Sequence, residues 1–118
     1  MLQFFSEKIG FRYPWPKYAQ ICVDEYGWGG MEHTSATTLN LSTLHDARAH
    51  LDVSSVNLVA HELAHQWWGN WLTCKSWQHF WLNEGITVFM TAAWKQQRWG
   101  EVAYERELAL AWRRWRSE

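Results

Sequence analysis

The sequence contains little cysteine. Its 118 residues include only Cys22 and Cys74, and neither belongs to a Cys-x-x-Cys pair. A zinc ribbon and a dithiol redox site are excluded, because both need closely spaced cysteines. We expect the two residues to be free thiols buried in the interior.

Long apolar runs and an excess of charge of one sign are also absent. No stretch reaches the ~18 consecutive apolar residues of a membrane span, and no secretory signal pattern occurs. The 11 Lys and Arg residues nearly balance the 12 Asp and Glu residues, for a formal net charge of −1. This balance gives no basic surface for nucleic acid. We expect neither a nucleic-acid partner nor a membrane anchor in this stretch, and the compartment stays undetermined.

Aromatic side chains, in contrast, are abundant. The chain has 11 tryptophans and 17% aromatic residues, within a hydrophobic content of 47%. This content suffices for one compact core, but several of the aromatics would pack against neighbours outside these residues. We therefore expect exposed aromatic surface.

The residues that carry chemistry begin with a His-Glu-x-x-His motif at His61, Glu62 and His65, followed downstream by Glu84. A helix turns ~100° per residue, so the two histidines lie on one face and both rings can reach one metal ion. Glu84 completes a His, His, Glu set with one position left for water, as in catalytic zinc sites. Glu62 lies beside this face, where it can take a proton from that water. The sequence thus predicts one Zn²⁺ held by His61, His65 and Glu84, with Glu62 as general base.

Other zinc signatures fit less well. A metzincin requires Gly and His where this chain has Trp68 and Trp71, and no inverted His-x-x-Glu-His motif occurs. The spacing therefore favours a gluzincin.

The segments 61–70 (HELAHQWWGN) and 81–85 (WLNEG) resemble the M1 family of zinc aminopeptidases, the gluzincin group of aminopeptidase N and leukotriene A4 hydrolase. Upstream, Gly29, Gly30, Met31, Glu32 and His33 are similar to the family's Gly-x-Met-Glu-Asn exopeptidase motif, with His33 in place of the usual Asn. The resemblance implies that this motif binds substrate and that Glu32 anchors its free N-terminus. A Gly-Gly segment also lets backbone approach a bound peptide closely.

The resemblance implies a zinc-dependent aminopeptidase that hydrolyses the N-terminal peptide bond of peptides. Two alternatives remain: a gluzincin endopeptidase in which Glu32 is incidental, and a zinc-binding fragment without turnover in isolation. The second arises because the family's oxyanion-stabilising tyrosine is expected beyond residue 118. Tyr104 follows Glu84 too closely to be that residue.

The expected fold is α+β, a thermolysin-like zinc metallopeptidase core made of a small sheet and metal-binding helices. Residues 1–118 would be a single segment of an M1 catalytic domain, a partial domain that lacks the N-terminal β domain and the C-terminal helical domain. These remaining domains of the parent protein are expected partners, together with a peptide substrate that has a free N-terminus.

Local patterns predict the elements of this core. We expect a helix at 2–9, an interior strand at 18–23, a second extended piece at the Gly-rich motif and a third at 37–41. The metal helix would be capped by Asp52 or Ser54 and run to Trp68, with Gly69 and Asn70 as a left-handed stop. Further helices would span 81–99 and continue from 101, the last with acidic residues early and arginines late.

Overall fold

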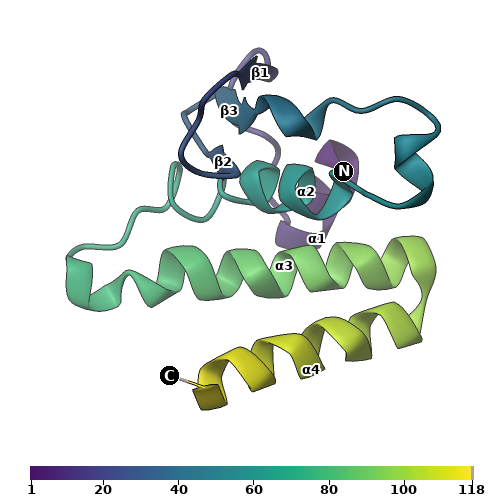
Figure 1. The fold of residues 1–118 in the computed structure, drawn as a ribbon. Helices are drawn as coiled ribbons and strands as arrows, with labels where there is room; N and C mark the ends of the chain where they lie inside the picture. Colours follow the sequence, from purple (N-terminus) through teal and green to yellow (C-terminus); the bar gives the residue numbers. More distant parts are fainter. Residues whose placement is uncertain (118) are drawn as a thin grey trace.

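The computed structural model describes residues 1–117, which form a small sheet at one side of a group of helices (Figure 1). The helices predicted at 2–9, at 81–99 and from 101 are confirmed. The first and third strands begin and end within one residue of the predicted segments, and the second covers two residues of the Gly-rich motif. The principal elements are α1 (Leu2–Ile9), β1 (Ala19–Val23), β2 (Gly30–Met31), β3 (Ala36–Asn40), α2 (Val56–Ala64), α3 (Trp81–Trp99) and α4 (Glu101–Ser117).

The sheet has the strand order β1-β3-β2. β3 pairs with β1 in parallel and with β2 antiparallel, so β3 is the central strand among the described residues. The prediction that 18–23 is an interior strand is therefore wrong. Leu39 and Thr37 of β3 are buried, whereas Ile21 and Val23 of β1 are exposed. Pairing of Gly30 with Leu39 holds the Gly-rich motif against this central strand.

The metal helix α2 ends earlier than predicted. It stops at Ala64 rather than Trp68, and Gly69 has a φ of 131°, outside the left-handed helical region. After Ala64 the chain makes wider turns, in which Asn70 N donates to His65 O and Leu72 N donates to Trp67 O. At the other end Ser55 is the first flanking residue, and the Oγ of the predicted cap Ser54 accepts a bond from Val56 N at 3.3 Å.

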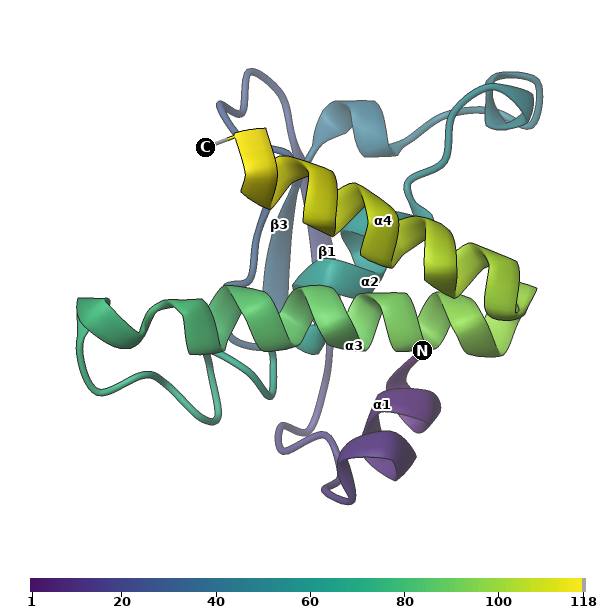
Figure 2. The same ribbon diagram turned by 90° about the horizontal axis from the view of Figure 1, so that it is seen from below.

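Helices α3 and α4 form an antiparallel pair (Figure 2). Gly100, with φ 85°, makes the turn between them, a conformation that suits glycine. Lys95 of α3 forms an ion pair with Glu107 of α4, and Gln96 bonds Glu101. The pair runs past α2, which packs on α3.

The core lies where α1, α2 and α3 meet. Phe5, Leu63 and Trp67 are almost fully buried there, with Met90 and Trp94 from α3. The indole of Trp67 donates to Phe11 O at 2.9 Å, so this buried polar atom is satisfied. These contacts fix α2 and α3 against each other.

The surface carries many aromatic side chains, as expected from the composition. Trp77 is 84% exposed and Trp28 is 72% exposed. The prediction of buried cysteines is wrong, because both Cys22 and Cys74 are free but partly exposed. Among the described residues, no helix is both long and apolar enough to cross a membrane.

Leu39 offers a test of the sheet's role. Leu39→Ala should lower the free energy of unfolding by about 2–5 kcal/mol, because it leaves a cavity behind the strand that holds the Gly-rich motif. Leu51→Ala, at an 84% exposed leucine, is the matched control and should change it by less than about 0.5 kcal/mol. Urea denaturation measures both variants, and equal losses would contradict the burial of Leu39.

Candidate metal centre

Helices α2 and α3 bring the three predicted ligands together. The Nε2 atoms of His61 and His65 lie 3.1 Å apart. The carboxylate of Glu84, on the first turn of α3, lies 3.4 Å from each of these nitrogens. Residues from two separate helices thus offer three donor atoms to one point.

These separations suit a tetrahedral metal ion. Zinc holds nitrogen and oxygen ligands at ~2.0–2.2 Å, which places two tetrahedral ligands roughly 3.3 Å apart. His61, His65 and Glu84 also form the one group of three or more potential ligand residues found among residues 1–117. Two imidazoles and a carboxylate are the ligand types of catalytic zinc.

The ring of His65 is oriented by its second nitrogen. Its Nδ1 lies 2.9 Å from Trp68 O and 3.2 Å from Thr87 Oγ1. Because a carbonyl oxygen only accepts hydrogen bonds, Nδ1 carries a proton, and the ring turns its Nε2 toward the centre. This arrangement is typical of histidine ligands, whose outer nitrogen donates to a fixed acceptor.

Charges in the centre are strongly coupled. The hydrogen bonds to His61 and His65 hold the pKa of Glu84 well below its usual range. Burial works against protonation of His65, but the bond to Glu84 and the charge of Glu32 outweigh it and raise the pKa of His65. Glu84 is therefore a carboxylate, the form that binds a metal ion.

Glu62 lies beside the centre but faces the sheet. Its residue is 5% exposed, and its Oε2 has no hydrogen-bond partner among the described residues. Burial raises the pKa of Glu62 to about 7, although His61 and His65 act in the opposite direction. Gly30 permits this position, because a Cβ there would lie 2.6 Å from Glu62 Oε1. A carboxyl group with such a pKa can both take and return a proton near neutral pH.

Glu32 lies next to His65, on the side of its outer ring nitrogen. Its Oε1 lies 3.8 Å from His65 Nδ1, and its side chain is 16% exposed. Its carbonyl accepts bonds from Gln66 Nε2 at 3.0 Å and from Asn70 Nδ2. The backbone that carries this carboxylate is thus tied to the chain that follows α2.

The rest of the Gly-rich motif is more open. Met31 is 37% exposed, and the exposed His33 lies with its Nδ1 3.0 Å from Thr38 Oγ1. Gly29 lies against Leu58, whose Cδ1 would be 3.3 Å from an added Cβ. Of these three residues, Gly29 lines the pocket described below, and none belongs to the group of ligand atoms.

Sequence reasoning missed the residues that hold the centre in place. Gln66 is fully buried, and its Oε1 accepts from Ser35 N at 2.8 Å while its Nε2 donates to the carbonyls of Glu32 and His33. Thr87, also buried, contacts His65. The polar Gln66 in an otherwise apolar buried stretch was the available signal.

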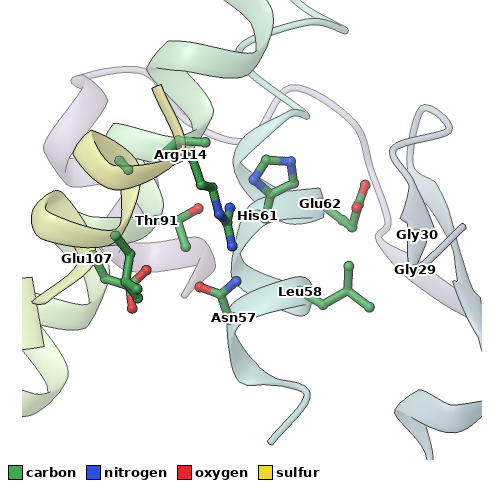
Figure 3. A pocket seen from close by; sticks show the side chains of 12 residues that line it. Gly29, Gly30, Asn57, Leu58, His61, Glu62, Thr91, Glu107 and Arg114 are labelled. Atoms are coloured by element: carbon green, nitrogen blue, oxygen red, sulfur yellow. The ribbon is translucent and has the colours of Figure 1, made fainter. Parts of the chain in front are cut away.

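A pocket of about 340 Å³ adjoins the centre (Figure 3). His61 and Glu62 of α2 line it together with Gly29 and Gly30 of the Gly-rich motif. α3 and α4 form the remaining wall. The proposed base and one candidate ligand therefore face a space that can receive a small molecule.

Comparison with known proteins identifies the family. The model of the peptidase family M1 domain matches residues 1–117. The chain belongs to peptidase family M1.

Curated and solved relatives agree with this membership. Leucine aminopeptidase 2 of Saccharomyces cerevisiae (strain S288c) is 46% identical over 86 residues, which cover 72% of this chain and 12% of that protein. Leucine aminopeptidase 2-1 of Meyerozyma guilliermondii is 41% identical over 72% of this chain and 13% of its own length.

The structure of native leukotriene A4 hydrolase from Saccharomyces cerevisiae matches with a TM-score of 0.79 and 37% identity, over 94% of this chain and 17% of that one. The yeast enzyme in complex with bestatin matches with a TM-score of 0.80 and 38% identity over the same shares. The chain therefore spans about an eighth of the curated relatives' length.

Gln66 provides a test of the link between the Gly-rich motif and α2. Gln66→Ala should lower the free energy of unfolding by about 2–4 kcal/mol, because buried backbone groups lose their partners. Gln97→Ala, on the exposed side of α3, should change it by less than about 0.5 kcal/mol. Thermal or urea unfolding compares the two, and a Gln66 variant as stable as the Gln97 variant would rule out this link.

Proposed function

We propose that this chain is the metal-binding part of a zinc-dependent aminopeptidase. The convergence of His61, His65 and Glu84 on one point, with Glu62 beside it, carries the proposal. Membership of family M1 and the aminopeptidase names of the relatives support it. Substrate and reaction are proposed for the whole protein, of which this chain is a segment.

His61, His65 and Glu84 would hold one Zn²⁺. When bound, the ion supplies Lewis acidity, which polarises a peptide carbonyl and acidifies water. The contacts of His65 Nδ1 with Trp68 O and Thr87 Oγ1 hold its ring in the orientation that metal binding requires. The low pKa of Glu84 keeps the third ligand ionised.

Glu62 is the proposed general base. Its residue is buried and lines the same pocket as His61, where it would act on water held at the centre. It would take the proton of that water and return it to the amine of the leaving peptide. Its pKa of about 7 suits both transfers.

Glu32 is the proposed anchor for the substrate's α-ammonium group. Its carboxylate lies 3.8 Å from the outer nitrogen of His65, beside the proposed metal centre. Gly29 and Gly30 would let the peptide backbone approach β2, while Met31 and His33 flank the same motif. Such an anchor would place the first peptide bond over the centre, so that one residue would be removed at a time.

The proposal includes the architecture around this chain. We place residues 1–118 in the catalytic domain, as a thermolysin-like core in which one helix carries two ligands and the next carries the third. The N-terminal β domain, the C-terminal helical domain and an oxyanion-stabilising tyrosine are expected elsewhere in the parent protein. Tyr104 is half-buried on α4 and is not assigned to this role.

Substitution of Glu62 separates metal binding from catalysis. Glu62→Gln should retain one Zn²⁺ per chain and lose hydrolysis by about 10²–10⁴-fold, because the amide cannot accept the proton. His65→Ala should lose the metal as well. Atomic absorption and release of N-terminal residues by the full-length protein measure both effects, and undiminished turnover by Glu62→Gln refutes the base assignment.

Blocking the substrate's N-terminus tests the exopeptidase assignment. The full-length protein should hydrolyse a free peptide and reject its N-acetylated form, because acetylation removes the charge that Glu32 attracts. Glu32→Gln should lower kcat/KM for the free peptide by about 10- to 100-fold, the loss of a charge-assisted bond. Equal hydrolysis of the two peptides would instead favour an endopeptidase.

A further inference from the structure

The loop between β3 and α2, residues 41–55, contains a pair of histidines that the metal centre does not use. His45 is half-buried and His50 is exposed, and the Nε2 of His45 lies 2.8 Å from the Nδ1 of His50. The two rings are nearly parallel, with an angle of 13° between them and centroids 5.1 Å apart. Because the centroids are further apart than the two nitrogens by about the width of one ring, the rings meet edge to edge, as in a hydrogen bond.

This contact depends on how many protons the two rings carry. A hydrogen bond between two nitrogens needs one proton and one lone pair. When both rings are neutral, or when only one of them is protonated, one nitrogen of the contact can keep its lone pair. When both rings are protonated, each nitrogen carries a proton and two positive charges face each other. The contact then changes from attractive to repulsive.

The pair joins the two halves of the loop. The Nδ1 of His45 lies 3.1 Å from Thr43 O, which also accepts a bond from Ser55 Oγ at 2.7 Å. Ser55 is the residue directly before α2. His50, on the other side, belongs to a single 3₁₀ turn at Ala49–Leu51. The bond between the rings therefore ties this turn to the residues that lead into α2.

The pair has no carboxylate partner in the part of the chain that the structure describes. The ion pairs among residues 1–117 lie at the metal centre and between α3 and α4, and none reaches either ring. Asp46, the carboxylate nearest in sequence, accepts a bond from Ala49 N at 2.8 Å. The first turn of the loop packs against β1, and the first turn of α2 carries no charge. The other charged side chains of the loop and of the turn after β1 are Arg48, Asp52, Asp24 and Glu25.

We propose that the His45–His50 pair is a proton-sensitive latch, which holds loop 41–55 closed near neutral pH and releases it in acid. Imidazole side chains ordinarily change charge near about pH 6.5, so such a latch works in a mild range. Release frees the start of α2, where Asn57 and Leu58 line the pocket beside the metal centre. The latch thus links acidity to one wall of this pocket, and its test requires no hydrolysis.

Hydrogen–deuterium exchange of the full-length, Zn²⁺-loaded protein measures the latch. The backbone amides of residues 50–53 donate to carbonyls within the loop, so their exchange reports whether the loop is closed. After correction for the intrinsic pH dependence of exchange, they should exchange about 2- to 10-fold faster at about pH 5 than at about pH 8, which corresponds to the loss of one hydrogen bond. Peptides from α1 are the internal reference and should show no such increase.

Variants of His50 separate the latch from a general effect of acid. His50→Asn places an amide donor near the position of Nδ1 and does not titrate, so the loop should exchange slowly at both pH values. His50→Ala removes the bond and should exchange fast at both. His79→Ala, at an exposed histidine outside the loop, is the matched control and should keep the pH dependence of the unmodified protein. An unmodified protein without this pH dependence, or a His50 variant that keeps it in full, would overturn the proposal.

Discussion

The packing of α2 against α3 is the interaction on which the rest of the structure depends. It places two imidazole nitrogens and a carboxylate within 3.1–3.4 Å of one another. The apolar core formed by Leu63 and Trp67 with Met90 and Trp94 holds the two helices together and so fixes the relative positions of these three side chains.

One short stretch of chain organises three functions around this packing. His61 and His65 face α3, Glu62 faces the pocket and the sheet, and Gln66 holds the backbone of Glu32. Gln66 is the residue directly after His65, and it shares the Glu32 carbonyl with Asn70, so the backbone of Glu32 is tied to the chain that carries the ligand pair. The distance between the proposed ammonium anchor and the metal centre is thus held by these two side-chain amides and by the pairing of β2 with β3.

Much of this arrangement could be predicted from sequence because it is local. The helices α1, α3 and α4 follow apolar periodicity, and Gly10 and Gly100 mark helix ends that only a flexible backbone tolerates. The convergence of Glu84 with the two histidines could be anticipated from the motif and its spacing. The early end of α2 could not, because it depends on the bond between His65 and Trp68 O, formed in the folded chain.

Longer-range pairings could not be predicted from the sequence either, because they too form only in the folded chain. β1 lies at the edge because β3 lies between it and β2, a choice made by tertiary packing rather than by strand propensity. The partners of Gln66 lie 31–34 residues away in the chain, and nothing local indicates them. Both cysteines are partly exposed. The exposure of a small apolar residue is decided by the tertiary packing around it, and its residue type alone does not predict it.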